Sequence, residues 1–145
     1  MTSQLNVDTI VDKAGSGGSN VKMANTSTYV SDGGAVTQNT VQGLCKAWCS
    51  LDGTGTASFT GSFNMASITD HGTGTFTVTF TNAMANTNYS AQGTAGHAVG
   101  VTGDVVATFN SDSSIATNSC KFASHSGGTI RDVPFNFYNI HGDLA

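Results

Sequence analysis

Residues 74–82 read GTFTVTFTN, and this stretch decides the fold class. Phe76, Val78 and Phe80 occupy every second position, and threonines occupy the positions between them. Because successive side chains of a β-strand point to opposite faces, this alternation predicts a strand with one apolar, buried face and one polar face.

Similar patterns continue on both sides of this strand, separated by turn signals such as Asp52-Gly53. Within the preceding pattern, Phe59, Phe63 and Met65 are in phase, and Gly61 indicates a bulge or a close packing point. Strands at a spacing of roughly ten residues predict an antiparallel β-sandwich or jelly-roll-like domain over residues 43–145. The expected strands, besides the one at 74–82, are 44–51, 56–68, 89–97, 104–110, 133–140 and, more weakly, 119–124.

The composition favours the same all-β fold class. Charged residues make up 10 % of the chain, against about 25 % in average soluble domains. The chain is rich in Gly, Ser, Thr and Asn, which are poor formers of helix interiors. The net charge is −4 and the five basic residues are scattered, so we expect no nucleic-acid partner. No apolar run approaches the ~20 residues of a membrane span, and residues 1–13 lack the order of a secretion signal. We therefore expect assembly in a cytoplasm without membrane insertion.

The first 42 residues differ from the rest. Their one apolar cluster is followed by a Gly/Ser-rich linker at 15–19 and by polar sequence through Thr40. Because this segment cannot close a core alone, we predict an extended N-terminal attachment arm that orders by adding a strand to a neighbour or by docking on a larger particle. The residues expected to contact the partner are Leu5, Val7, Ile10 and Val11.

Cys45, Cys49 and Cys120 are the three cysteines. In a strand, Cys45 and Cys49 would lie about 13 Å apart on one face, too far for a disulfide between them. We expect small buried apolar groups. A bridge from either residue to Cys120, a bond between subunits, and metal binding remain as alternatives.

Several segments resemble a family of tail-fibre-like bacteriophage appendage proteins. Residues 46–56, KAWCSLDGTGT, resemble the family's KAWVNFNGTGT, and residues 62–74, SFNMASITDHGTG, resemble SFNVSSITDNGTG. The similarity continues through residues 76–84 and 88–89, which match YTVNFTTAM…NY. Residues 5–10, LNVDTI, are similar to the LKVDTI opening of such proteins, and residues 139–143 fit their short terminal strand.

The resemblance implies a structural virion component, commonly a homotrimer, at or near a fibre tip, with the arm bound to other virion proteins and the tip contacting a host glycan or protein. It supplies no catalytic residue. The chain shows no shaft repeat, so a tail fibre, a short tail appendage, a head decoration protein and a receptor-binding tip module all stay open.

Motifs for chemistry are missing from the sequence: it has no G-x-S-x-G, H-E-x-x-H or phosphate-loop pattern. We therefore expect neither an enzyme nor a cofactor. The histidines, which are widely spaced, are expected to be exposed loop residues, although one per subunit on a trimer axis would suit a metal. The aspartates are expected in turns and at strand edges; two of them converging for glycan cleavage stays an alternative.

The last predicted strand carries bulky residues on both faces, so we expect one face to be covered by the core and the other by another subunit. Trp48, the only tryptophan, is expected in the core or at the same contact, with sugar stacking as an alternative. The residues predicted at the oligomer interface are Trp48, Phe137, Tyr138 and Ile140. Polar loops at 86–88, 100–104 and 110–118 would suit hydrogen bonding to a host molecule or plain connections.

Overall fold

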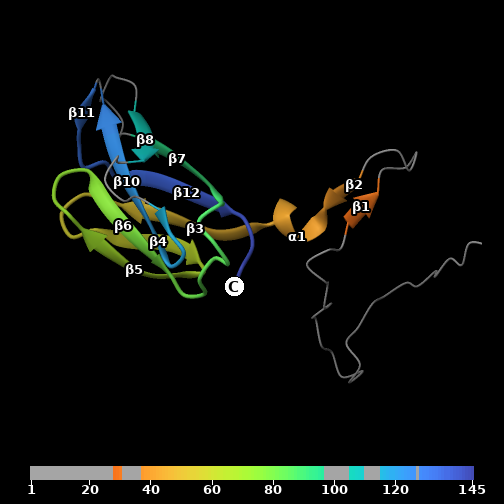
Figure 1. The fold of residues 1–145 in the computed structure, drawn as a ribbon. Helices are drawn as coiled ribbons and strands as arrows, with labels where there is room; N and C mark the ends of the chain where they lie inside the picture. The colour runs from red at the N-terminus through yellow and green to blue at the C-terminus, as the bar shows by residue number, and fades with distance from the viewer. Residues whose placement is uncertain (1–27, 31–36, 97–104, 110–114, 127) are drawn as a thin grey trace, which may run out of the picture. The chain divides into compact units, whose positions relative to one another are not determined.

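The computed structural model describes residues 28–30, 37–96, 105–109, 115–126 and 128–145 (Figure 1). The chain divides into two units, Met1–Val41 and Gln42–Ala145, one residue from the boundary expected after residue 42. The part of the arm that is predicted to contact a partner lies outside the described residues; it comprises Leu5, Val7, Ile10 and Val11.

The described part of the first unit contains a strand pair. Strand β1 (Thr28–Val30) pairs antiparallel with β2 (Thr37–Asn39), and Thr28 lies opposite Asn39. A four-residue helix, α1 (Thr40–Gly43), follows. The two short polar strands of this unit thus satisfy part of their backbone hydrogen bonding by pairing with each other.

The second unit is all-β and antiparallel, as predicted. Its sheet has the strand order β4-β3-β12-β7-β8-β10-β6-β5, and β9 and β11 pair with β10. The strands are β3 (Cys45–Asp52), β4 (Ser58–Phe63), β5 (Met65–Asp70), β6 (Thr75–Phe80), β7 (Ser90–Gly96), β8 (Val105–Phe109), β9 (Ile115–Ala116), β10 (Ser119–Ser126), β11 (Thr129–Ile130) and β12 (Phe135–His141).

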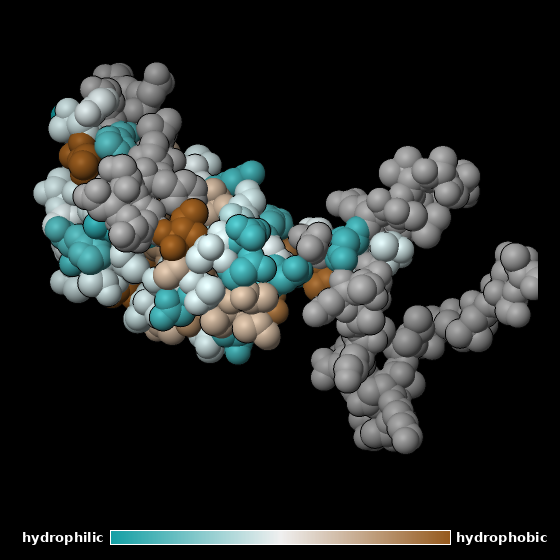
Figure 2. Space-filling view, in the orientation of Figure 1, coloured by the Kyte–Doolittle hydropathy of each residue, from teal (hydrophilic) through white to brown (hydrophobic). Residues whose placement is uncertain are grey.

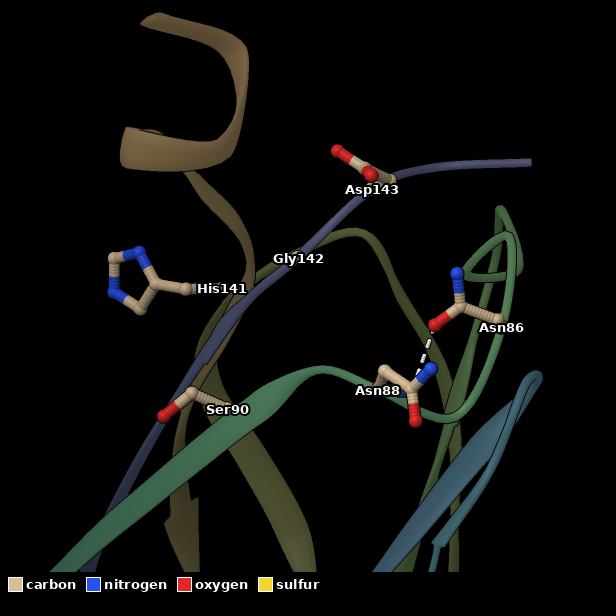
Figure 3. A pocket seen from close by; sticks show the side chains of 6 residues that line it. All are labelled: Asn86, Asn88, Ser90, His141, Gly142 and Asp143. Carbon is tan, nitrogen blue, oxygen red and sulfur yellow. Dashed lines mark hydrogen bonds between the residues drawn. The ribbon is translucent and has the colours of Figure 1, made fainter. Parts of the chain in front are cut away.

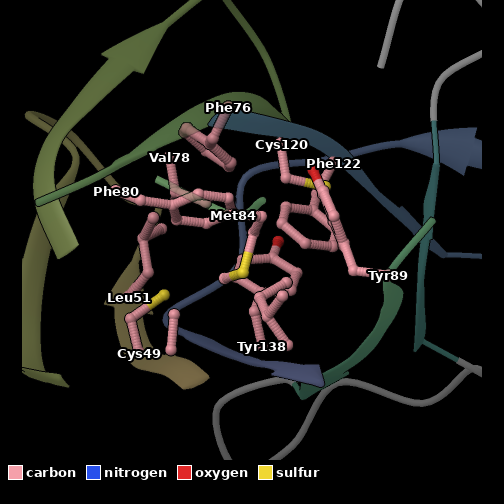
Figure 4. Close-up of a cluster of buried hydrophobic side chains, with 12 residues drawn as sticks. Cys49, Leu51, Phe76, Val78, Phe80, Met84, Tyr89, Cys120, Phe122 and Tyr138 are labelled. Atoms are coloured by element: carbon pink, nitrogen blue, oxygen red, sulfur yellow. The ribbon is translucent and has the colours of Figure 1, made fainter. Parts of the chain in front are cut away.

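This sheet curls so that its two halves face each other as a β-sandwich. Strands β10 and β12 are separated by β7 and β8 in the strand order. Nevertheless, the rings of Phe122 on β10 and Tyr138 on β12 stack with centroids 3.8 Å apart and planes 15° from parallel. Figure 4 shows these rings at the centre of the apolar cluster, with side chains from both halves converging on them.

The core follows the alternation that the sequence predicts. On β6, Phe76, Val78 and Phe80 are all buried, and on β3 the alternate residues Cys49 and Leu51 are buried. The cluster of buried residues comprises Ala47, Cys49, Leu51, Phe76, Val78, Phe80, Met84, Tyr89, Cys120, Phe122, Tyr138 and Ile140. Two strands from each half supply most of these side chains.

The strand predicted over 56–68 is two strands in the structure. Asn64 has a φ of 56°, a left-handed conformation that ends β4 and starts β5 in another part of the sheet. Within β4 the register shifts, because Ser50 lies opposite Gly61 whereas Leu51 lies opposite Phe59. The extra residue is Thr60, so a bulge lies directly beside Gly61, where the sequence indicated a bulge or a close packing point. The bulge explains why Phe59 packs on the core while Phe63 is exposed.

The strands of the C-terminal region lie where they were predicted, but one of them is longer and makes more pairings than expected. The weakest predicted strand, 119–124, is the eight-residue β10, which pairs with β6, β8, β9 and β11. Pro134 directly precedes β12, as expected, so its missing N–H costs no ladder hydrogen bond.

Candidate functional site

Four aromatic side chains are exposed on the outer side of one half of the sandwich. Trp48 on β3 lies directly opposite Phe63 on β4. On the neighbouring strand β12, Phe137 lies opposite Ser50 and therefore points to the same side as Trp48, and Phe135 follows two residues earlier. The exposed fractions are 41 % for Trp48, 54 % for Phe63, 47 % for Phe135 and 46 % for Phe137. We call these four residues the aromatic face.

The indole of Trp48 lies beside Gly61, next to the bulge on β4. A Cβ atom placed on Gly61 would lie 3.5 Å from Cζ3 and 3.7 Å from Cη2 of Trp48, so the six-membered ring extends over this glycine. Thr60, the extra residue of the bulge, donates its hydroxyl to Ser50 Oγ at 2.7 Å. A Cβ at position 61 would therefore make an ordinary van der Waals contact with the Trp48 ring.

The side chains that flank the aromatic face on β12 and β7 are neutral. The register places Gln92 opposite Asn139 and Thr94 opposite Phe137 on this side, and Ser50 lies between Trp48 and Phe137. Asp52, at the end of β3, is the nearby acid; hydrogen bonds from the Thr54 hydroxyl and amide lower its pKa. Elsewhere, the described surface in the view of Figure 2 is mainly hydrophilic to neutral, with separate hydrophobic spots.

The structure corrects half of the predicted interface. Trp48 and Phe137 are exposed, but Tyr138 and Ile140 are fully buried in the subunit's own core. The core face of β12 is therefore the one with Asn136, Tyr138 and Ile140, because Tyr138 stacks on Phe122. Alternation along the strand then turns Phe135 and Phe137 outward. The sequence did not predict Phe63 and Phe135 as members of this face. Phe63 points outward because the bulge on β4 changes the alternation of its side chains, and the sequence alone does not show which face a residue beyond a bulge points to.

A pocket of about 320 Å³ lies at another part of the same unit (Figure 3). In the view of Figure 3, Asn86 and Asn88 lie on one side of Gly142, and Ser90 and His141 lie on the other. Asp143 completes the lining. Every lining side chain that extends beyond the backbone carries a hydrogen-bonding group.

The walls of this pocket are held by backbone contacts. Ser90 on β7 lies opposite His141 on β12, and the Ala85 amide donates to the Asp143 carbonyl oxygen at 2.8 Å. The Asn86 side-chain oxygen accepts from the Asn88 amide at 2.7 Å, which closes the loop between β6 and β7. The predicted polar loop at 86–88 thus forms part of a pocket, whereas 100–104 and 110–114 lie outside the described residues.

The floor of the pocket requires a glycine. A Cβ atom on Gly142 would lie 2.7 Å from Cβ of Tyr89. Tyr89 is itself fixed, because its hydroxyl lies 2.9 Å from the Ala116 carbonyl oxygen and 3.0 Å from that of Ser119. The close approach of residue 142 to Tyr89 therefore defines the shape of the pocket.

Asp70 has the predicted turn role, because it accepts a hydrogen bond from the Gly72 amide at 2.8 Å. Asp132 instead makes a long-range contact: it accepts a hydrogen bond at 2.5 Å from the amide of Gly74, 58 positions earlier in the chain. Among the described histidines, His71 is exposed, as expected, while His125 and His141 are half-buried. No group of three or more His, Cys, Asp or Glu side chains that could hold a metal ion occurs among the described residues.

All three cysteines are free. Cys49 and Cys120 are buried, as predicted, and Cys45 is half-buried. Burial raises the pKa of both Cys49 and Cys120 to about 12. These two thiols therefore stay protonated and unreactive at neutral pH.

Comparison of the chain with protein-family models, curated proteins and solved structures finds no match. In the part of the chain that the structure describes, no helix is long and apolar enough to cross a membrane.

Proposed function

We propose that the protein is a non-enzymatic structural subunit of a bacteriophage particle, a tail-fibre or short tail-appendage subunit that assembles as a homotrimer through its aromatic face. The observation that carries the self-assembly is the exposure of Trp48, Phe63, Phe135 and Phe137 on one side of the sheet. Large exposed apolar patches on soluble proteins mark interaction sites.

The size of the aromatic face suits the centre of an interface. With about half of each side chain exposed, the four residues present roughly 300–450 Å². A standard interface buries about 800 Å² on each partner, with an apolar centre and a polar rim. Gln92, Thr94 and Asn139, which flank the aromatic face, would form that rim. Because the four aromatic residues and the flanking Gln92, Thr94 and Asn139 carry no charge, another uncharged patch matches them well, which supports a second copy of this chain as the partner.

The virion location and the trimer rest on the sequence resemblance in residues 46–56 and 62–74. A head decoration protein is the alternative that the same resemblance allows. A receptor-recognition module at a fibre tip is a second candidate, and the pocket lined by Asn86, Asn88, Ser90, His141, Gly142 and Asp143 is the observation that favours it.

Light scattering on the purified full chain tests the self-assembly. We expect a mass of three times 14.8 kDa. A monomer that stays monodisperse at high concentration would overturn it. Antibody labelling of phage particles, seen by electron microscopy, tests the location separately: label at the tail supports an appendage, label over the head supports a decoration protein, and no label on particles rejects both.

A further inference from the structure

Strands β4 and β5 are the two ends of the sheet (Figure 1). We infer that the β5 end accepts an added strand from a second copy of this chain, and that the strand is residues 5–11 of that copy. The contact rests on the proposed self-assembly, which brings the copies together, but not on the virion location. It uses a different surface from the aromatic face.

Both end strands have one side along which no other described strand pairs. β4 pairs with β3 alone, and β5 pairs with β6 alone. A strand at the end of a sheet presents a row of backbone N–H and C=O groups to the outside. An extended segment of another chain can pair with such a row, so each end is a possible acceptor.

The positions of the bulges distinguish the two ends. On β4 the extra residue, Thr60, lies in the middle of the strand and interrupts its pairing with β3. On β5 the register shift falls between Met65 and Ser67, so Ser67–Asp70 pair with β6 without interruption. Bulges, prolines and lysines hinder the addition of a further strand, and β5 contains neither proline nor lysine. Ser67–Asp70, which we call the β5 edge, is therefore the better acceptor.

The apolar core is incompletely covered beside the β5 edge. Met65 and Ile68 on β5 pack against the buried cluster but are themselves only half-buried. Ala57, just before β4, and Phe59 on β4 are half-buried in the same way. A strand added to β5 would place every second side chain beside Ile68, over this apolar surface. Burial of that surface would then add to the backbone hydrogen bonds in stabilising the contact.

Residues 5–11, LNVDTIV, have a side-chain pattern that suits this edge. In an extended conformation alternate side chains share a face. One face carries Leu5, Val7, Thr9 and Val11, and the other carries Asn6, Asp8 and Ile10. The first face, which is mainly apolar, would cover the half-buried core residues. The second would lie beside the exposed hydroxyls of Ser67 and Thr69.

The chain between this segment and the first described residue is long enough to reach a second copy. Residues 12–27 include the Gly/Ser-rich linker at 15–19 and can span up to about 55 Å. A domain of about 100 residues is roughly 35 Å across. Copies that already touch through the aromatic face would hold the segment at a high effective concentration near a neighbour's β5 edge.

The test is crosslinking between two co-expressed full-length variants, both with Cys45→Ser so that the half-buried native thiol does not compete. The donor carries Asp8→Cys, and the acceptor carries Thr69→Cys, an exposed position on the β5 edge. Ser67→Cys takes its place if this acceptor does not fold. A short bis-maleimide, which tolerates an offset in register, joins the thiols. We expect a product of twice 14.8 kDa, in which mass spectrometry finds the donor peptide linked to the acceptor peptide.

Two substitutions that add the same charge test the strand alternation. Val7→Asp in the donor places a carboxylate on the apolar face, so the crosslinking yield should fall at least ~tenfold, because a charge is costly to bury among apolar side chains. Asn6→Asp places the carboxylate on the other face and should leave the yield nearly unchanged. Equal yields for the two variants would overturn the strand contact.

Control acceptors test the choice of edge. Ser62→Cys on β4 and Asn118→Cys before β10 are exposed positions away from the β5 edge, and both should give low yields. A higher yield from Ser62→Cys than from Thr69→Cys would overturn the assignment to β5. Light scattering of the same samples separates the two proposals. A trimer without the crosslink rejects the strand contact alone, whereas a monomer without the crosslink rejects the self-assembly as well.

Discussion

The hydroxyl of Ser124 donates to the side-chain oxygen of Asn136 at 2.5 Å, inside the apolar core and between strands from opposite halves of the sandwich. The Asn136 amide nitrogen in turn donates to the carbonyl oxygens of Leu51 at 3.2 Å and Val133 at 2.9 Å. One buried amide thus satisfies polar groups of three separate segments, which fixes their relative positions.

Asn136→Ala should lower the free energy of unfolding by about 3 kcal/mol, because it leaves buried polar groups without partners. Ser124→Ala should cost about 1 kcal/mol. The double variant should cost less than the sum, since both residues share one hydrogen bond. Urea denaturation at fixed protein concentration measures all three. Additive losses would show that the two side chains do not act together.

The stacked pair of Phe122 and Tyr138 should dominate the stability of the core. We expect Tyr138→Ala to cost about 3–5 kcal/mol, as do other large-to-small changes of aromatic core residues. Tyr138→Phe should cost less than ~1.5 kcal/mol, because the Tyr138 hydroxyl lies 3.5 Å from Asn136 Oδ1, at the limit of a hydrogen bond. Thermal unfolding of both variants checks this order. Equal losses would assign the stability to the hydroxyl rather than to the ring.

Gly55 and Gly74 have nearly equal φ angles but different surroundings. Comparing their alanine variants therefore distinguishes the cost of a left-handed conformation from the cost of a steric clash. Gly55 has a φ of 64° and Gly74 a φ of 63°. A Cβ on Gly55 would meet open space, whereas a Cβ on Gly74 would lie 2.6 Å from the Arg131 carbonyl oxygen. Gly55→Ala should therefore cost about 1–2 kcal/mol from the left-handed conformation alone.

Gly74→Ala should cost more than Gly55→Ala by at least ~1 kcal/mol, because the backbone at Arg131 must also move. Chemical denaturation of the two variants in parallel gives the difference. If the two variants are equally stable, then the approach of residue 74 to Arg131 is not a tight contact in solution.

Substitutions on the aromatic face should change assembly without unfolding the subunit. Phe137→Ser and Trp48→Ser remove exposed apolar surface, so we expect the solution mass to fall towards 14.8 kDa while the far-UV circular dichroism is unchanged. Ile115→Ser is the matched control, because Ile115 is also exposed but lies on β9. A drop in mass for Ile115→Ser, or none for Phe137→Ser, would contradict the proposed interface.

The buried thiols should make the protein less stable at high pH. The pKa values of Cys49 and Cys120 are raised to about 12 in the folded state, against about 8.5 in an unfolded chain. Below about pH 8 both states are protonated, so this contribution to stability is fully present. As the pH rises from about 9 towards 12, the unfolded state ionises first and the contribution is lost.

Stability measured from pH 7 to 11 should therefore fall with rising pH, and Cys49→Ala should flatten part of that fall. At pH 8 a thiol reagent should modify Cys45 in the native protein, and Cys49 and Cys120 only after denaturation. Rapid labelling of all three native thiols would show that the core opens readily.

The sequence alone determined the all-β class and the placement of most strands, because side-chain alternation and turn residues are local signals. The run at 74–82 is strand β6 with the predicted face inward, and Asp52-Gly53 and Pro134 mark strand ends as expected. The burial of Cys49 and Cys120 was expected from the apolar character of the thiol, whereas Cys45 is only half-buried.

Tertiary structure decided what alternation cannot: which of two bulky faces is turned inward. On β12 both faces carry aromatic residues, and the stacking of Tyr138 on Phe122, a residue 16 positions earlier, buries one face and leaves Phe137 exposed. The left-handed Asn64 split one predicted strand into two. The pocket, too, arises only because β7 and β12 pair and bring Ser90 beside His141. Each of these depends on contacts between residues distant in sequence, whose energies no local pattern contains.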